Sequence, residues 1–108
     1  MSLEVGIDIE KISRFKKKPV TFLKSIFSDK EIDYCKNKSD PSASFTGKFC
    51  AKEAVIKAYN KKITARNIEI LNDESGKIKV YIDGKWQNNI TCSISHTNDT
   101  AIAIAMIY

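Results

Sequence analysis

The sequence predicts an α+β fold: a small single domain, residues 1–108, with helices packed on an antiparallel sheet. After an opening strand, helical patterns fill the first half of the chain, and strand patterns separated by turn residues fill the second half. The 108 residues fit one domain and contain no internal repeat or linker. A chain this short buries only a modest core, which association of copies would enlarge.

The first strand is predicted by a strict alternation of side chains. Its apolar positions are Leu3, Val5, Ile7 and Ile9. Alternation with a period of two over residues 3–10 is typical of a strand with one apolar face. A short helix is expected from Lys11 to Arg14, where the Lys-Lys-Lys-Pro run at 16–19 interrupts it. A further short helical segment is expected over residues 20–25.

Two longer helices carry clear start signals. Ser28 followed by Glu31 is a capping box, and the helix that it starts should run to about Lys36. The Asp40-Pro41 pair supplies a cap and a first-turn proline for the next helix. That helix should continue through residue 59, which makes it the longest element.

The second half of the chain reads as strands. The runs at 68–70 and 78–82 flank the turn residues 72–76, which is a hairpin signal. The Asp-Gly pair at 83–84 marks another turn. Residues 90–95 and 101–108 are predicted to be two further strands. The last strand is apolar at almost every position, so we expect it to be buried on both faces.

The composition limits the classes of function. The formal net charge is +5, which indicates an acidic partner or substrate. No apolar run approaches the ~20 residues of a membrane span, and no secretory signal is recognisable, so we expect a cytoplasmic protein. The three cysteines, Cys35, Cys50 and Cys92, cannot complete a zinc site with the single histidine, His96. Reduced, partly buried thiols are therefore expected.

Several charged residues occur where an apolar face is expected. Asp8 and Glu10 share one face of the first strand, about 6.5–7 Å apart, and Gly6 leaves open space beside them. On the long helix, Glu53 and Lys57 are neighbours one turn apart and interrupt the apolar arc that should face the sheet. A charge there needs a counterion, a metal or a phosphate. The simpler interpretation is a solvated strand face and an ordinary surface pair.

Further residues in the chain are suited to phosphate. Lys48 and Lys52 lie near the border of the same arc, although they also fit a solvated helix flank. Ser95 and His96 end a strand at a turn, where a lone histidine is often structural. No matched base and acid supports a Ser-His nucleophile. Carboxylates suit Mg²⁺ and lysines suit a pyrophosphate, so the predicted chemistry is metal-assisted displacement at phosphorus.

Three motifs resemble those of a known family. They are Gly6-Ile7-Asp8-Ile9-Glu10 with Arg14, the segment Gly47–Ala58 with its Lys-Glu-Ala and Lys-Ala core, and Ser93-Ile94-Ser95-His96. In this order they resemble the signatures of the phosphopantetheinyl transferases. The order and the chain length are similar to those of the short holo-acyl-carrier-protein synthase type. The larger, two-lobed members contain two pseudo-repeats, which 108 residues cannot hold.

The resemblance implies the 4′-phosphopantetheinyl transferase fold and an Mg²⁺-dependent enzyme. The implied reaction moves 4′-phosphopantetheine from coenzyme A to a serine of apo-acyl carrier protein and releases adenosine 3′,5′-bisphosphate. The resemblance also implies a place in lipid metabolism and fatty acid biosynthesis, with no nucleic acid or membrane partner. The short members are homotrimers with active sites between adjacent protomers.

The resemblance also implies roles for individual residues. Asp8 and Glu53 correspond to the Mg²⁺ ligands that hold the pyrophosphate of coenzyme A. Glu53, or a water that it orients, would accept the serine proton, and Lys57 would neutralise charge on the attacked phosphate. Arg14, joined by Lys11, would dock the acidic carrier protein. The implied contacts to coenzyme A are Lys48, Lys52, Lys57, Ser95 and His96.

Two residues depart from the short type. Glu10 stands where a non-acidic residue is usual, and an Asp-x-Glu arrangement is more typical of the two-lobed members, in which both carboxylates bind metal. Glu10 is therefore either a third metal ligand or a solvent-facing acid. Lys48 stands where an arginine is common, and lysine lacks the bidentate fork of arginine.

Three other functions remain open from the sequence. Asp83-Gly84-Lys85 has the carboxylate-x-Lys spacing of metal-dependent nucleases, although Asp-Gly is chiefly a turn signal. The positive charge permits a nucleic-acid-binding module, but no stacking platform or helix-turn-helix is apparent. A catalytically inactive relative that binds a carrier protein or nucleic acid is the third alternative.

Overall fold

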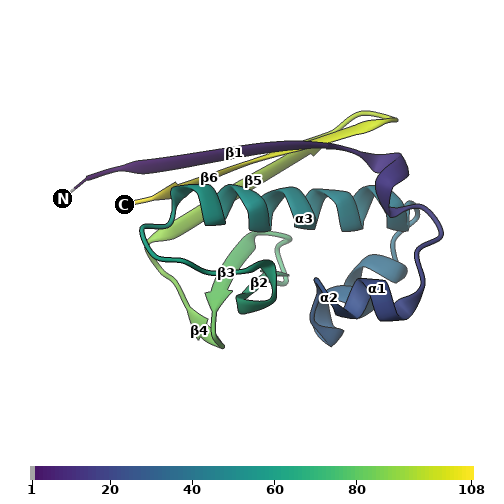
Figure 1. The fold of residues 1–108 in the computed structure, drawn as a ribbon, viewed down its shortest axis with the longest axis horizontal. Coiled ribbons are helices and arrows are strands. Elements are labelled where there is room, and N and C mark those ends of the chain that lie inside the picture. The colour runs from purple at the N-terminus through teal and green to yellow at the C-terminus, as the bar shows by residue number, and fades with distance from the viewer. Residues whose placement is uncertain (1) are drawn as a thin grey trace.

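Figure 1 shows the arrangement of the elements in the computed structural model, which describes residues 2–108. In chain order they are β1 (Glu4–Lys11), the 3-10 helix η1 (Ile12–Phe15), α1 (Val20–Lys24), α2 (Asp29–Lys36), α3 (Pro41–Ala58), the 3-10 helix η2 (Ala65–Asn67), β2 (Ile68–Asn72), β3 (Ile78–Ile82), β4 (Lys85–Trp86), β5 (Ile90–His96) and β6 (Thr100–Ile107). Helices pack on two antiparallel sheets, which confirms the predicted α+β class.

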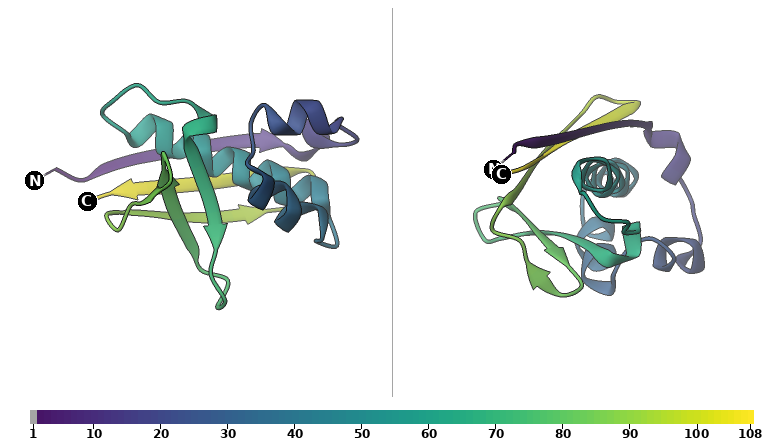
Figure 2. Two further views of the ribbon diagram at one scale, coloured as in Figure 1. Left: turned by 90° about the horizontal axis from the view of Figure 1, so that it is seen from below. Right: turned by 60° about the vertical axis from the view of Figure 1, so that its left-hand side comes forward.

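The long helix α3 lies between two layers. The right panel of Figure 2 looks along α3, with the sheet β1-β6-β5 on one side and the sheet β2-β3-β4 with the short helices on the other. The central strand β6 presents a row of alanines to the helix. These are Ala101, Ala103 and Ala105, each at most 1% exposed. Small side chains on this row let α3 approach the sheet closely.

Gly6 marks the closest approach between β1 and α3. A Cβ atom at this position would lie 1.9 Å from the carbonyl oxygen of Ala54, so no residue larger than glycine fits without moving the helix. The face of β1 that carries Gly6 and Asp8 is therefore the face against α3. This contact fixes the helix residues near Ala54 relative to the polar side chains of the strand.

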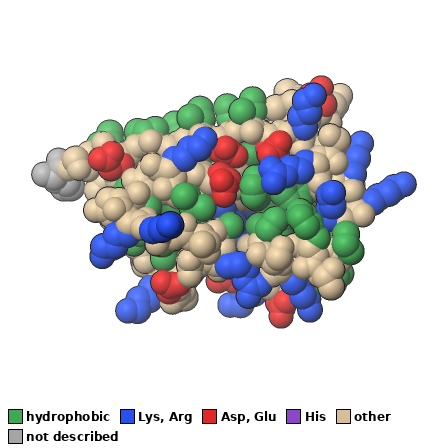
Figure 3. Space-filling view, in the orientation of Figure 1, with side chains coloured by type: hydrophobic (Ala, Val, Ile, Leu, Met, Phe, Trp, Pro, Cys, Tyr) green, Lys and Arg blue, Asp and Glu red, His purple; other side chains and the backbone are tan. Residues whose placement is uncertain are grey.

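The apolar face of the first sheet points outward. Ile7 and Ile9 on β1 are 53% and 63% exposed, and Ile102 and Ile104 on β6 are 37% and 39% exposed. Figure 3 shows the resulting hydrophobic band along the β1 edge of the molecule. The prediction that the last strand is buried on both faces is thus wrong for the single chain, because only its alanine face is covered. Contiguous exposed apolar surface of this kind marks an interaction site.

Two apolar clusters hold α3 in place. The larger one joins α3 to both sheets and includes Val55, Ile70 and Val80, all fully buried. The second cluster is aromatic and joins η1, α1, α2 and the start of α3. Its rings are Phe15, Phe22, Phe27, Phe45 and Phe49, with neighbouring centroids 5.1–6.0 Å apart.

The predicted helix starts are confirmed in atomic detail. Ser28 Oγ accepts from the Glu31 backbone N–H at 3.3 Å, and the Ser28 N–H donates to Glu31 Oε1 at 2.9 Å, which completes the capping box. Asp40 Oδ1 accepts from the Ala43 N–H at 3.2 Å at the start of α3. The Asp83-Gly84 pair forms the predicted turn, with φ of 51° and 80°. The two-residue strand β4 that follows was not predicted.

Two further findings concern the features examined in the composition. Within residues 2–108, no helix is long and apolar enough to cross a membrane. The three cysteines are free, with Cys35 and Cys50 buried and Cys92 half-buried.

Candidate active site

Asp8, Glu53 and Lys57 meet where α3 crosses the polar face of β1. Glu53 and Lys57 stand one turn apart on the helix, next to the Gly6–Ala54 contact. The Lys57 Nζ donates to Asp8 Oδ1 at 3.2 Å and to the Ile7 carbonyl oxygen at 2.8 Å. The structure therefore brings together three of the side chains that the sequence places in one site.

Glu53 lies in a surrounding that disfavours its charge. Burial raises the pKa of the Glu53 carboxyl above its ordinary value of 4.5, and the negative charge of Asp8 raises it further. Lys57 and Arg14 oppose that shift without cancelling it. Two neighbouring carboxylates with one shared lysine thus form a locally undercompensated pair of negative charges.

This donor set fits a hard divalent cation. Mg²⁺ is commonly held by one or two carboxylates together with substrate phosphates and waters. Asp8 and Glu53 supply two carboxylates, and across residues 2–108 no group of three or more acidic, histidine or cysteine side chains is arranged as a metal site. The remaining ligands of a cation here would accordingly come from a substrate or from water.

Glu10 is engaged by another partner. It shares the inward face of β1 with Asp8, but its carboxylate forms an ion pair with Arg14, four residues further along the chain. The Arg14 guanidinium also lies 4.7 Å from the centroid of the Phe49 ring. In this structure Glu10 is therefore directed at Arg14 and not at the Asp8–Glu53 pair.

The pKa of the Cys50 thiol is affected by the same acidic residues. Burial and the negative charge of Asp8 raise the pKa of the Cys50 thiol to about 12, and Sγ donates to the Ala101 carbonyl oxygen at 3.6 Å. A thiol held neutral in this way is not a nucleophile at neutral pH. Covalent cysteine chemistry is thus no part of the site.

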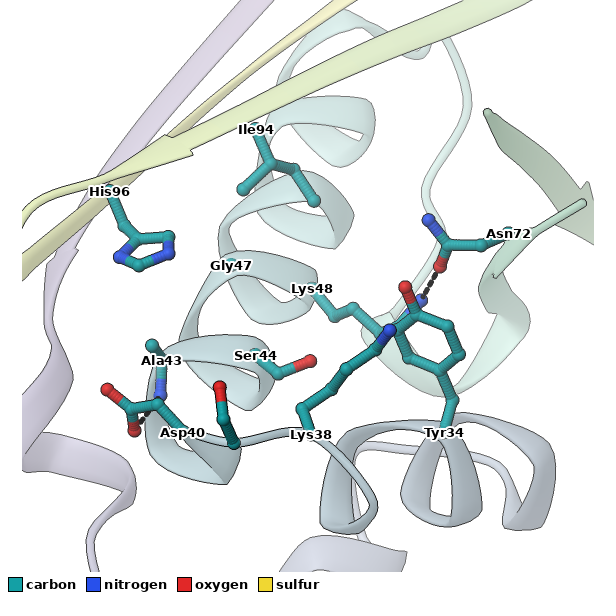
Figure 4. Close-up of a pocket in the computed structure, with 11 residues that line it drawn as sticks. Tyr34, Lys38, Asp40, Ala43, Ser44, Gly47, Lys48, Asn72, Ile94 and His96 are labelled. Carbon is teal, nitrogen blue, oxygen red and sulfur yellow. Dashed lines mark hydrogen bonds between the residues drawn. The ribbon is translucent and has the colours of Figure 1, made fainter. Parts of the chain in front are cut away.

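A pocket of about 300 Å³ opens on another side of α3 (Figure 4). It is lined by residues of α2, α3, β2, β5 and the loop before α3: Tyr34, Lys38, Ser39, Asp40, Ala43, Ser44, Gly47, Lys48, Asn72, Ile94 and His96. The ammonium groups of Lys38 and Lys48 lie 4.3 Å and 4.5 Å from the centroid of the Tyr34 ring. The His96 ring stands across the pocket from them.

The lysine ammonium groups of this pocket contact neutral groups and no carboxylate. Lys48 is 3% exposed, and its Nζ donates to the Ile70 carbonyl oxygen at 2.5 Å and to Asn72 Oδ1 at 2.8 Å. Burial lowers the pKa of Lys48. Among the described residues, neither the Lys38 nor the Lys48 ammonium has a carboxylate within 4.0 Å. Two cations without an anion create a site suited to a phosphate.

Comparison with known families agrees with this combination of an acidic pair and a basic pocket. Residues 4–105 match the model of the 4′-phosphopantetheinyl transferase superfamily. The chain belongs to this superfamily. The resemblance drawn from the three motifs is therefore confirmed.

Members of this family match the chain over nearly its full length. The holo-[acyl-carrier-protein] synthase of Chlorobaculum tepidum is 39% identical, covering 96% of this chain and 97% of that protein. The holo-[acyl-carrier-protein] synthase structure of Helicobacter pylori in complex with coenzyme A has a TM-score of 0.79 at 28% identity, covering 96% and 99% of the two chains. The Bacillus anthracis synthase structure in complex with CoA (3′,5′-ADP) has a TM-score of 0.80 at 27% identity, covering 96% and 94%.

Lys52 of this transferase lies away from both groups of residues. Its side chain is 1% exposed, and its Nζ forms an ion pair with Glu31 at 2.7 Å. The same Nζ also donates to the carbonyl oxygens of Ile26, Ala65 and Ile68, at 2.6–3.1 Å. These four acceptors exceed the three donors of an ammonium. Lys52 thus has no free donor for a phosphate, contrary to the sequence expectation.

The two residues at the end of β5 face opposite sides of the sheet. His96 points toward α3 and lines the basic pocket, whereas Ser95 lies on the outward apolar face beside Ile7 and Ile102. Ser95 is thus on the exposed apolar face of the first sheet and not in the basic pocket. The sequence motif had placed both residues in one rim.

Three pocket residues escaped the sequence analysis: Tyr34, Lys38 and Asn72. They come from α2, from the break before α3 and from the end of β2, and no spacing relates them. The only sequence signal was a basic residue in a polar break directly before the long helix. Their convergence depends on the packing of α2 and β2 against α3.

Proposed function

We propose that this chain is a holo-[acyl-carrier-protein] synthase. It transfers 4′-phosphopantetheine from coenzyme A to a serine of apo-acyl carrier protein and releases adenosine 3′,5′-bisphosphate. The observation that carries the proposal is the meeting of Asp8, Glu53 and Lys57 at the β1–α3 contact. Family membership and full-length synthase relatives support the same reaction.

The metal site proposed here consists of Asp8 and Glu53. Mg²⁺ bound there would offset negative charge on the pyrophosphate of coenzyme A. Glu10 is a third ligand in this proposal only when its ion pair with Arg14 opens. Two protein carboxylates leave positions for phosphate oxygens, which is the usual arrangement for Mg²⁺ in phosphoryl transfer.

Glu53 and Lys57 carry the proposed chemical roles. The serine oxygen of the carrier protein attacks the β-phosphorus of coenzyme A, and the bond to the adenosine-bearing phosphate breaks. Glu53, or a water that it orients, accepts the serine proton, which is the general-base role of a carboxylate. The Lys57 ammonium, 55% exposed, faces the site and neutralises charge that develops on the attacked phosphate.

The basic pocket is the proposed site for a further phosphate of coenzyme A. Lys48, Lys38 and His96 supply the polar groups, and the Tyr34 ring holds the two ammonium groups at its face. Since Lys52 is saturated in the core, we leave it out of this site. None of the pocket residues belongs to the Asp8–Glu53 pair, so one ligand must reach two separate groups.

A homotrimer with active sites between protomers would account for the exposed sheet face. Ile7, Ile9, Ile102 and Ile104 form contiguous apolar surface next to Ser95. A second copy packed there would cover that surface and add its own polar groups beside the first copy's site. Sedimentation equilibrium tests this part: a trimer is expected, and an Ile104→Asp variant should dissociate to monomers.

The acidic carrier protein is proposed to dock on Arg14, with Lys11 beside it. Both are exposed at the junction of β1 and η1, next to the acidic pair. The proposed setting is the cytoplasm, and the proposed pathway is fatty acid biosynthesis.

One experiment tests the reaction directly. The protein is mixed with coenzyme A, Mg²⁺ and apo-acyl carrier protein, and the carrier is weighed by mass spectrometry. We expect a mass gain equal to phosphopantetheine, lost when EDTA replaces Mg²⁺. Carrier binding without any mass gain would favour the inactive-relative alternative.

A further inference from the structure

Arg14 is held between an acid and two aromatic rings. Its guanidinium pairs with Glu10 and lies 4.7 Å from the centroid of Phe49 and 5.8 Å from that of Phe15. The Arg14 side chain is 47% exposed and the Glu10 side chain 24% exposed. Glu10 is itself fixed, because its Oε1 accepts from the Lys11 N–H at 3.1 Å.

We propose that Glu10 is an internal competitor for Arg14, which weakens docking of the acidic carrier protein and so sets the enzyme's selectivity among carriers. This inference rests on the proposed docking role of Arg14. The carboxylate of Glu10 occupies the guanidinium group that a carrier carboxylate would bind.

The structure favours competition over support, because Arg14 has another means of orientation. The Phe49 ring is 9% exposed and packs in the aromatic cluster, so it forms a fixed platform under the guanidinium without help from Glu10. Cation–π contacts of this kind favour the position of a guanidinium over the ring face independently of a carboxylate. Loss of Glu10 would thus leave Arg14 oriented but unoccupied.

The pair is also weak enough to be displaced. It joins residues four positions apart on an exposed stretch, and such pairs typically change an equilibrium by a small factor. A carrier protein that offers several carboxylates would replace Glu10, whereas a carrier with few acidic groups at this point would not. Glu10 therefore raises the charge requirement that a carrier must meet.

The test is a binding measurement that involves no turnover. Fluorescence anisotropy measures the affinity of labelled apo-acyl carrier protein, with its acceptor serine replaced by alanine, for the wild type and four variants. The variants are Glu10→Gln, Arg14→Ala, the double variant, and Glu4→Gln. Glu4 is the matched control, because it stands on the same strand, is exposed and lies about 20 Å from Glu10.

We expect Glu10→Gln to tighten carrier binding roughly two- to fivefold at low salt. Arg14→Ala should weaken it, the double variant should bind like Arg14→Ala alone, and Glu4→Gln should bind like the wild type. The gain from Glu10→Gln should shrink as ionic strength rises, because exposed charges are screened.

The contrary results separate the two ideas. If Arg14→Ala bound as tightly as the wild type, the docking role would be wrong and this inference with it. If Arg14→Ala weakened binding but Glu10→Gln also weakened it, Glu10 would be a support for Arg14, and competition would be overturned. Equal gains from Glu10→Gln and Glu4→Gln, or a gain that persists in the double variant, would reduce the effect to overall charge and also overturn it.

Discussion

Lys52 and Lys57 stand five positions apart on α3, and each is paired with one carboxylate, yet their surroundings differ. Lys52 and Glu31 are 1% and 0% exposed, 2.7 Å apart, and every remaining donor and acceptor of the pair is satisfied by backbone groups. Lys57 and Asp8 are 55% and 17% exposed and 3.2 Å apart, and Glu53 adds a second acid beside them.

The difference indicates that the first pair stabilises the fold and that the second group is available to bind a ligand. In the Glu31–Lys52 pair the charges are balanced and saturated, so the pair ties α2, α3 and β2 together and has nothing left to bind. In the Asp8–Glu53–Lys57 group one cation faces two acids, and the group is open to solvent. Excess negative charge at an accessible position is what recruits a divalent cation.

The largest expected effect concerns the open group. Glu53→Gln should lower the rate of phosphopantetheine transfer by roughly 10²–10⁴-fold, because it removes both the proton acceptor and a proposed metal ligand. The protein should remain folded, since Glu53 is only half-buried and does not join helices and strands through hydrogen bonds as Glu31 does. Mass-spectrometric transfer rates and circular dichroism check both parts. Full activity at ordinary Mg²⁺ would contradict the assignment.

A substitution in the buried Glu31–Lys52 pair should lower the stability of the fold. Lys52→Met leaves Glu31 buried without its counterion, so we expect a loss of about 3–5 kcal/mol in the free energy of unfolding. Urea denaturation measures it. The matched control is Lys57→Met, which removes an exposed pair and should cost less than about 1 kcal/mol. Equal losses in the two variants would mean that the two ion pairs contribute alike to the stability of the fold.

A smaller effect tests whether the close contact of β1 with α3 positions Asp8, Glu53 and Lys57. Gly6→Ala places a Cβ atom 1.9 Å from the Ala54 carbonyl oxygen, so α3 must move away from β1. Overpacking of this kind costs typically 1–3 kcal/mol of stability. The same movement should separate Glu53 and Lys57 from Asp8, so turnover should fall more than the stability loss explains. Urea denaturation and mass-spectrometric transfer rates measure the two changes.

The smallest effect is on the pH dependence of stability without metal. The pKa of Glu53 is raised in the fold, so its contribution to stability is present below 4.5 and is lost as pH rises through the folded pKa. Relative to wild type, Glu53→Gln should therefore gain stability as pH rises above 4.5 in EDTA. Melting temperatures of the two proteins across this range measure the difference. A constant offset would mean that Glu53 titrates normally.

The sequence predicted the open group better than the saturated one, for a physical reason. Strand and helix periods place Asp8 and Glu53 on facing surfaces, and a charged residue on such a surface is visible in the pattern. The helical period predicts which face of α3 carries Lys52, but it does not predict whether that side chain is buried or exposed. Likewise, Ser28 and Glu31 were recognised as a cap from their spacing, but the contact of Glu31 with Lys52 spans 21 positions and depends on tertiary packing.

The orientation of the first strand shows the same limit. Alternation predicted one apolar and one polar face, but the usual assumption that the apolar face is inward fails here. Gly6 and the alanine row of β6 make the polar face the one that α3 can approach, and the isoleucines are left outside. The basic pocket was predictable only in part: Lys48 and His96 were expected at a phosphate, but Tyr34, Lys38 and Asn72 belong to three unrelated segments.

The proposed mechanism depends most on Asp8 and Glu53 forming one metal site. Electron paramagnetic resonance with Mn²⁺ as the probe, in the presence of coenzyme A, measures this directly for the wild type, Asp8→Asn, Glu53→Gln and the double variant. Each single substitution should weaken Mn²⁺ binding roughly tenfold or more, and the double variant should bind no more tightly than either single variant. Wild-type affinity in either single variant would contradict the claim.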